Sequence, residues 1–323
     1  MIPGEVMFQR VEVSWLGGAA GMGLPVPAAR VFGDVVRAAL PERSAVSLDF
    51  GCGAARCWLE AEAPAGAPLV LPHLRRPDPM DLALAWNRAR ASVDRDEVHE
   101  AALAAVRAGG LPGRADFSSA WAAFRAMPRQ VVVVGRHARS RFPPRPAAPA
   151  EQAPLAGVTL VRLDARLARV SLVWLADPET ASARAMLVGG YTSRLVQRLR
   201  VRDALVYHLE VGTDDDGAEM LVAPGDVAAV VTAVRDEVAR LGAAGPDADE
   251  LVAVHLRAQA RLAAARETLA GRAWLEGRRL LSGAAPPFAG VQALPDPAIV
   301  ITGPAPGVTP DRTWDPSAVW GPG

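Results

Sequence analysis

The chain has 323 residues, which is enough for two ordinary domains that each bury a core of their own. Half of its residues are apolar and 35 basic residues balance 35 acidic ones, so no excess charge favours binding to nucleic acid or to a membrane surface. All the basic residues are arginine, and alanine, glycine and proline are abundant. This residue usage is typical of a GC-rich bacterial genome.

The amino-terminal stretch has no basic segment followed by an apolar one, so it lacks the pattern of a secretion signal. No run approaches the roughly 20 apolar residues of a membrane-spanning helix. Cys52 and Cys57 are too few for a disulfide framework and lack the C-x-x-C spacing of metal and redox sites. We therefore expect a soluble cytoplasmic protein whose cysteines are buried or idle thiols in a reducing compartment.

The first half of the chain shows a few clear elements. An alternating strand is predicted at residues 10–16, a capped amphipathic helix at 93–109, and a short buried strand at 128–136, where valines stand between proline and glycine. Residues 141–157 are rich in proline and alanine without a period, which predicts a semi-rigid linker. We therefore expect an N-terminal domain at residues 1–140 and a linker at 141–156.

The second half begins with two predicted strands within residues 157–175, followed by a helix at 186–200 and a strand at 204–212. Asp226 can cap a further helix, which we expect Gly242 to stop. The apolar residues of that helix recur at helical spacing on one face, namely Val227, Val230, Val231, Val234, Val238 and Leu241.

The next helix starts from a near capping box, because Asp247 precedes Glu250 by three residues. We expect this helix to reach about residue 269, to be interrupted at Gly271 and to continue to about residue 281. A buried strand is predicted within residues 295–304. These elements define a C-terminal domain at residues 157–307, and the proline-containing remainder, 308–323, is expected to be a loosely ordered tail.

The two halves share three landmarks in the same order, which suggests an internal duplication. Residues 10–16 match 169–175 in length and alternation, residues 93–109 match 245–261 as capped helices, and the two valine-rich or isoleucine-rich strands match each other. Strands and helices neither alternate strictly nor segregate. We therefore predict an α+β fold of two tandem units, each an antiparallel or mixed sheet backed by helices, with the first unit degenerate.

Residues 189–212 read GGYTSRLVQRLRVRDALVYHLEVG and contain both tyrosines of the chain. This segment resembles the second domain of the M16 zinc peptidases, the insulinase and mitochondrial-processing-peptidase family, whose pattern is a glycine-rich turn, Ser-Ser-Arg-Leu, a helix ending in Leu-Arg, and Gly-Leu-x-Tyr. The matching residues are Gly189, Gly190, Thr192, Ser193, Arg194, Leu195, Leu199, Arg200, Leu205 and Tyr207. Ala204 replaces the usual glycine. The resemblance covers residues 157–304 well and the first half only in outline.

The first domain of such peptidases carries His-x-x-Glu-His and a downstream glutamate that hold zinc. A helical zinc pair needs two histidines four residues apart, and no two of the five histidines here have that spacing. If residues 28–40 form the equivalent helix, the ligand positions fall near Arg30, Gly33 and Asp34, which cannot supply two nitrogen ligands. The resemblance therefore implies no metal site and no cofactor in this chain, with zinc in a partner subunit.

The resemblance implies that Arg200 and Tyr207 are the catalytic candidates, because their equivalents donate hydrogen bonds to the substrate carbonyl across a chamber. The preceding Gly189, Gly190, Thr192 and Ser193 are the candidate peptide-binding residues. The alternative is structural: an arginine at a helix C-terminus is favoured by the helix dipole, and a tyrosine on a strand by its β-propensity.

Other polar residues are expected to be structural. His208 should point to the opposite sheet face from Tyr207, and Arg198 and Arg202 should face water. His99 and Glu100 suggest a metal site beside Glu97, but a solvated helix face is the favoured interpretation. The acidic stretch at residues 213–217 is expected to be a turn without a calcium ion.

These observations predict the zinc-free subunit of a heterodimeric M16-type metallopeptidase, inactive as an isolated chain, which lends Arg200 and Tyr207 to hydrolysis at the zinc site of a His-x-x-Glu-His partner. The substrate would be a flexible peptide, for instance a leader segment, bound as an added strand. No nucleic-acid or membrane partner is expected. The alternatives are a non-catalytic M16-like scaffold or peptide-binding protein, and a self-associating protein without a peptide role.

Overall fold

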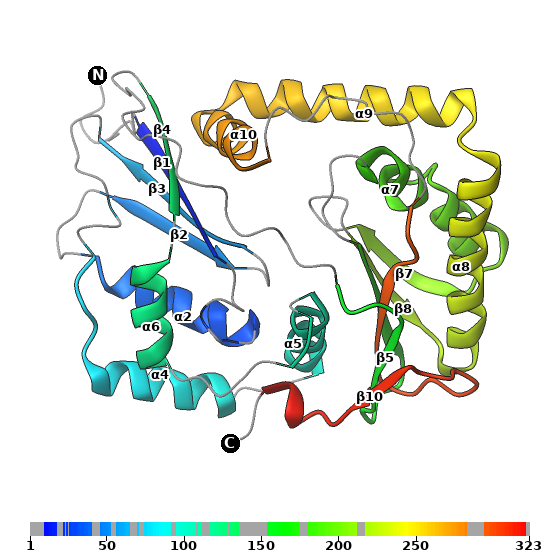
Figure 1. The fold of residues 1–323 in the computed structure, drawn as a ribbon, viewed down its shortest axis with the longest axis horizontal. Coiled ribbons are helices and arrows are strands. Elements are labelled where there is room, and N and C mark those ends of the chain that lie inside the picture. Colours follow the sequence, from blue (N-terminus) through cyan, green and yellow to red (C-terminus); the bar gives the residue numbers. More distant parts are fainter. Residues whose placement is uncertain are drawn as a thin grey trace, which may run out of the picture. The chain divides into compact units, whose positions relative to one another are not determined.

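The computed structural model divides the chain into two compact units, and many of their elements are labelled in Figure 1. It describes residues 10–17, 22, 24, 26–40, 46–52, 56–64, 70, 74–91, 95–107, 109–111, 117–127, 129–135, 154–174, 180–211, 217–282 and 294–320. The first unit comprises Met1–Val93, Gly113–Ala150 and Ala260–Ala284, and the second comprises Asp94–Pro112, Glu151–Gln259 and Ala285–Gly323.

The first unit is built on a sheet of four described strands in the order β2-β3-β1-β4, each antiparallel to its neighbours. The strands are β1 (Arg10–Gly17), β2 (Ser47–Cys52), β3 (Arg56–Ala63) and β4 (Arg129–Gly135). The predicted strands at residues 10–16 and 128–136 are therefore confirmed as β1 and β4.

Helices pack on both faces of this first sheet. The helix α2 (Val26–Ala38) packs on β2 and also against α4 (Pro79–Ala91), which contacts α6 (Phe117–Ala126). The ring of Phe32 meets Phe50, Phe117 and Phe124 edge-on at centroid distances of 5.5–6.3 Å. The helix α10 (Leu269–Ser282) lies against the opposite face and packs on β1 and β4. The ring centroids of Trp274 and Trp58 are 5.2 Å apart.

The second unit is built on a mixed sheet of six described strands in the order β10-β5-β9-β6-β8-β7. The short strand β5 runs parallel to β9 and β10, and the other pairs are antiparallel. The strands are β5 (Val158–Val161), β6 (Ala168–Val173), β7 (Val206–Val211), β8 (Gly217–Val222), β9 (Ala298–Thr302) and β10 (Arg312–Trp314).

Both faces of this second sheet are covered, which is why every residue of β5 and β9 is buried. One face packs against α7 (Ala181–Val188) and α8 (Val227–Ala244), and α5 (Arg95–Arg107) packs on β9 and β6 from the other side. All six apolar positions predicted for one face of α8 are buried, namely Val227, Val230, Val231, Val234, Val238 and Leu241.

Two helix boundaries differ from the predicted ones. Gly242 does not stop α8, which continues to Ala244 and ends at Gly245, where φ is +70°. The long helix α9 (Ala248–Glu267) breaks before α10 at Thr268, whose hydroxyl accepts the Gly271 backbone N–H at 2.9 Å. The break therefore involves both residues: the Thr268 hydroxyl caps α10, and Gly271 lies so close to the Ala265 carbonyl that a Cβ would overlap it.

The order of the described elements is alike in the two halves of the chain. The strands β7-β8-β6-β9 repeat the neighbour order and antiparallel sense of β2-β3-β1-β4. In each half of the chain, the described elements include, in order, a strand, a helical segment and a hairpin, followed by three α-helices and a last strand. This supports the α+β fold of two sheets backed by helices, and an origin by duplication stays a prediction.

The predicted domain limits need two corrections. Residues 94–112 belong to the second unit and residues 260–284 to the first, because α5 packs on the second sheet and α10 on the first. Residues 308–320 of the expected loose tail are ordered, since β10 pairs with β5 and Val319 is fully buried. Of the expected linker, residues 141–153 lie outside the described part of the chain.

The expectation of free thiols is wrong. Cys57 is fully buried and disulfide-bonded, and Cys52, the only other cysteine of the chain, lies directly opposite it in the β2–β3 hairpin. Disulfides persist mainly in oxidising compartments. The predicted reducing, cytoplasmic location therefore loses the support that idle thiols gave it, and it stays a prediction.

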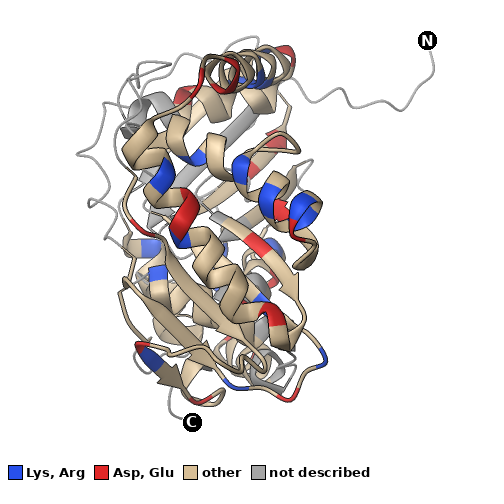
Figure 2. Cartoon of the chain, turned by 90° about the vertical axis from the view of Figure 1, so that its right-hand side faces the viewer, with Lys and Arg blue, Asp and Glu red and all other residues tan. Residues whose placement is uncertain are grey.

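Acidic and basic residues are interspersed on the side shown in Figure 2, in keeping with the zero net charge. Within the described residues, no helix combines the length and the apolar character needed to cross a membrane.

Candidate functional site

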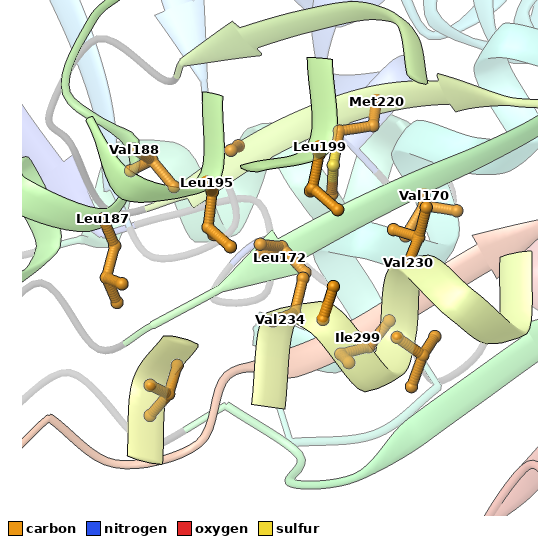
Figure 3. Close-up of a cluster of buried hydrophobic side chains, with 14 of the residues drawn as sticks. Val170, Leu172, Leu187, Val188, Leu195, Leu199, Met220, Val230, Val234 and Ile299 are labelled. Carbon is orange, nitrogen blue, oxygen red and sulfur yellow. The ribbon is translucent and has the colours of Figure 1, made fainter. Parts of the chain in front are cut away.

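The segment that carries Arg200 folds as a π-helical turn, η2 (Val196–Arg202), and not as the continuation of one helix from residue 186. The predicted helix is split at residues 189–193, after α7 ends. Leu195 and Leu199 are fully buried, and Figure 3 shows them within the cluster that contains Leu172 and Met220. Burial of these leucines fixes η2 against the second sheet and leaves Arg200 on the exposed side.

A tight turn joins η2 to β7. The Asp203 backbone N–H donates to the Arg198 carbonyl at 2.8 Å, and the Leu205 N–H donates to the Leu199 carbonyl at 2.8 Å. Between them Ala204 has a φ of +52°, which is the left-handed region that favours glycine. The M16-like sequence pattern has glycine at this position. The backbone of Ala204 keeps the conformation that glycine would adopt.

We expect Ala204→Gly to stabilise the protein by about 0.5–1 kcal/mol, because relief of the left-handed strain outweighs the added freedom of the unfolded chain. Ala239→Gly, on the exposed side of α8, is the matched control and should cost about 1 kcal/mol. Thermal unfolding of the two variants measures the difference. A loss of stability in Ala204→Gly equal to that of the control would contradict the assignment of strain.

Tyr207 lies at a bulge on an edge strand. In the pairing of β7 with β8, Val206 is opposite Val222 and His208 is opposite Leu221, so Tyr207 is the extra residue. Its side chain is 68% exposed, and His208 is exposed as well. The prediction that His208 points away from Tyr207 assumed a regular strand, and the bulge removes that alternation.

Arg200 and its neighbour Arg198 have different environments. Arg198 is only 17% exposed and pairs with Asp236 at 3.0 Å and Glu237 at 3.3 Å, so the expectation that it faces water is wrong. Arg202 is 60% exposed, as expected. Arg200 is exposed and forms no hydrogen bond or ion pair with any described residue. Its guanidinium is therefore available to an external acceptor.

Glu237 is a buried ion-pair partner in this region that was not predicted from the sequence. This carboxylate is 3% exposed on α8 and lies 3.3 Å from Arg198 and 3.2 Å from Arg240. It stands within the apolar face of α8, three residues after Val234 and one before Val238. An acidic residue inside an apolar stripe signals a buried partner, and here that partner holds η2 to α8.

Arg194, just before η2, ties this segment to the start of α9 and to the turn before it. Its guanidinium binds Glu250 through two hydrogen bonds, of 2.6 and 2.7 Å, and donates to the Gly245 carbonyl at 2.9 Å. The hydrogen bond raises the pKa of Arg194 and lowers that of Glu250. Glu250 also closes the predicted capping box, because it exchanges hydrogen bonds with Asp247 at 2.9 and 2.7 Å.

The four candidate peptide-binding residues lie together in the turn between α7 and η2, but they differ in exposure. Thr192 is exposed and Gly190 half-buried, with a φ of +124° that a side chain would strain. Gly189 is buried and Ser193 is only 2% exposed, so these two residues do not present a surface to a peptide. Tyr191, which was not among the candidates, is 80% exposed in the same turn.

The prediction that His99 lies on a solvated helix face is wrong: it is fully buried on the side of α5 that packs on β6 and β9. Its Nδ1 lies 2.6 Å from the Thr302 hydroxyl and its Nε2 lies 2.8 Å from the Ser171 hydroxyl. Burial, and secondarily the charge of Arg169, lowers the pKa of His99 to about 3. A neutral histidine hydrogen-bonded to two hydroxyls inside the core has a structural role, and the serine beside it is equally inaccessible.

The described residues do not fit a zinc site. Nowhere in the described ranges do three or more His, Cys, Asp or Glu side chains come together as metal ligands would. On α2, Phe32 and Val36 point into the core, and the exposed Asp34 pairs with Arg37. A Cβ at Gly33 would meet the Phe50 ring at 2.8 Å, so α2 packs too closely there to carry an inward ligand. His73, His137 and residues 213–216 of the acidic stretch lie outside the described residues.

No protein-family model and no curated protein matches the sequence. Solved structures match nearly the whole chain. The peptidase M16 inactive domain from Pseudomonas fluorescens aligns with a TM-score of 0.61 at 12% identity, covering 94% of this chain and 95% of that one. A chain of complex III2 from Candida albicans aligns at 0.57 and 12%, covering 93% and 92%. A protease from Helicobacter pylori aligns at 0.55 and 12%, covering 92% and 94%.

At this level of identity the likeness shows the fold. The chain has the mixed α/β fold of M16-like peptidase domains, as the segment at residues 189–212 predicts, and its neighbours include an inactive domain of that kind.

Proposed function

We propose that this chain is the zinc-free subunit of a two-chain M16-type metallopeptidase. In this proposal Arg200 and Tyr207 bind and polarise the scissile carbonyl of a peptide, and a partner subunit with a His-x-x-Glu-His motif holds the zinc. The observation that carries the proposal is that an M16-like fold presents both side chains to solvent, on either side of one tight turn, with Arg200 unpaired among the described residues.

The chemistry assigned to this chain is charge stabilisation. Attack on an amide places negative charge on the carbonyl oxygen, and a guanidinium and a phenol can both donate hydrogen bonds to it. The zinc of the partner would supply the attacking water in its activated form. Because Leu199, Glu237 and Arg194 fix the segment on both sides, the two donors need little reorganisation when charge develops.

The edge strand β7 supports binding of an extended peptide. It is the last described strand on its side of the sheet, so its outer backbone groups have no strand partner among the described residues. A peptide added there would pair with β7 by main-chain hydrogen bonds close to Tyr207. Flexible segments such as peptide leaders are the substrates that suit this mode, and the bulge sets the position of Tyr207 along them.

Reconstitution tests the proposal. The purified chain is mixed with a His-x-x-Glu-His subunit and zinc, and cleavage of a flexible peptide is followed together with zinc content. We expect cleavage only when both chains are present, with zinc retained by the partner. Tight stoichiometric zinc in this chain alone, or cleavage by this chain alone, would overturn the assignment.

A second candidate is a non-catalytic M16-like scaffold or peptide-binding protein. The match to a chain of complex III2, a multi-chain assembly, favours this alternative. A scaffold would bind its partner without using Arg200 or Tyr207 in the reaction. Activity that is unchanged when both residues are replaced would therefore support the scaffold.

A further inference from the structure

The first unit contains a pocket of about 410 Å³ that the proposed peptidase role does not use. It lies between α4, α6 and residues 74–79, and its volume is in the range of small-molecule sites, which is about 300–1,000 Å³. Four of its residues, Ser118, Trp121, Ala122 and Arg125, recur at helical spacing, so one face of α6 forms a wall.

Apolar side chains that the core holds in place contribute to this pocket. Leu74, Leu82 and Trp121 are all buried. The Trp121 ring packs at 6.0 Å from Phe32 and at 5.6 Å from Phe124. Because these rings belong to the aromatic core, the apolar part of the pocket is preformed and offers contact to a hydrocarbon or aromatic group.

The polar part of the described lining is cationic. Arg76 and Arg125 are both exposed, and Ser118 adds a hydroxyl. Arg125 takes part in another interaction within the protein, and the five N–H donors of a guanidinium leave others for a ligand. None of the described residues that line the pocket carries a carboxylate. The nearby Asp78 is engaged at the start of α4, where its Oδ1 accepts the Met80 N–H at 2.7 Å. Two guanidinium groups beside an apolar surface favour a ligand that carries an anionic group on an apolar body.

We propose that this pocket binds small apolar carboxylates, in which a carboxylate meets Arg76 and Arg125 while an aromatic or branched aliphatic group lies against Trp121, Leu74 and Leu82. Such a carboxylate can belong to a free organic acid or to the C-terminus of a short peptide. The inference concerns the first unit alone and does not depend on the peptidase proposal.

Calorimetric titration of the full chain tests this site with 3-phenylpropionate for the free acid and Gly-Phe for the peptide terminus, each compared with its carboxamide. Ligands of this size should bind with dissociation constants on the order of 1 mM. We expect at least one carboxylate to bind about tenfold more tightly than its amide, since charge-assisted hydrogen bonds to arginine are lost in the amide. The preference should shrink between low and high salt.

Variants locate the binding. In Arg76→Ala/Arg125→Ala the preference for carboxylate over amide should disappear, whereas the control Arg235→Ala, an exposed arginine of α8, should leave it unchanged. Both pocket arginines are exposed, so the double variant should fold, which circular dichroism checks. Equal binding of acid and amide by the unmodified protein, no measurable binding of either carboxylate, or a preference that survives the double variant would each overturn the proposal.

Discussion

In the proposed two-chain peptidase, reconstituted from both subunits, Arg200→Ala is expected to lower kcat by about 10²–10³-fold, and Tyr207→Phe by a similar factor. Each change removes one donor from the carbonyl oxygen at the moment when that oxygen gains charge. Neither change should unfold the chain, because Arg200 is exposed and the Tyr207 side chain is 68% exposed. Steady-state cleavage of a peptide under saturating partner measures the effect, and KM should change less than kcat.

Two adjacent residues serve as controls. Arg202 is an exposed arginine of the same segment, and His208 is the exposed neighbour of Tyr207. Replacing either by alanine should change kcat by much less than tenfold. If the control variants lose as much activity as the Arg200 and Tyr207 variants, activity depends on the integrity of the turn and not on the two hydrogen-bond donors. If neither Arg200→Ala nor Tyr207→Phe loses activity, the chain is a scaffold.

Local features of the fold could be predicted from the sequence because neighbouring residues determine them. The capping box of Asp247 and Glu250 needs residues only three positions apart, and it forms as expected. The apolar face of α8 follows from the helical period, and all of its predicted positions are buried.

Features that depend on distant segments could not be predicted in the same way. The period of residues 93–109 predicts a helix, but not that α5 packs on the sheet formed by the second half of the chain. For this reason the expected domain limits differ from the two compact units, in which α5 belongs to the second unit and α10 to the first. Likewise the sequence alone does not show that the β2–β3 register places Cys57 opposite Cys52.

The candidate site shows the same division. Arg200 and Tyr207 could be found from a sequence pattern, but their geometry depends on two backbone irregularities that the pattern does not encode. The π-helical turn η2 ends in the left-handed Ala204, and a bulge at Tyr207 shifts the register of β7. Both irregularities use an extra residue relative to regular helix or strand, and such insertions are frequent at functional sites.

The buried His99 gives the second large prediction, a loss of stability in mild acid. Its pKa is about 3 in the folded protein, well below the ordinary value of 6.5 in an unfolded chain. Below pH 6.5 His99 therefore binds a proton in the unfolded chain but not in the folded chain, so the free energy of unfolding falls as the pH falls. With about 1.4 kcal/mol for each pKa unit, the free energy of unfolding of the second unit should drop by about 2 kcal/mol between pH 7.5 and 5.

His99→Gln isolates this contribution, because glutamine can still hydrogen-bond to Thr302 and Ser171 but does not titrate. Urea unfolding followed by hydrogen exchange in β6 and β9 at each pH reports on the strands that His99 contacts. The variant should be less stable than the unmodified chain at pH 7.5, since the amide fills the site imperfectly, and the two should converge toward pH 5. The exposed His208 and His255 are present in both proteins and cancel in the comparison. If the free energy of unfolding falls as steeply with pH in the variant as in the unmodified chain, the acid sensitivity arises from other groups. Neutral His99 then does not stabilise the packing of α5 on the sheet.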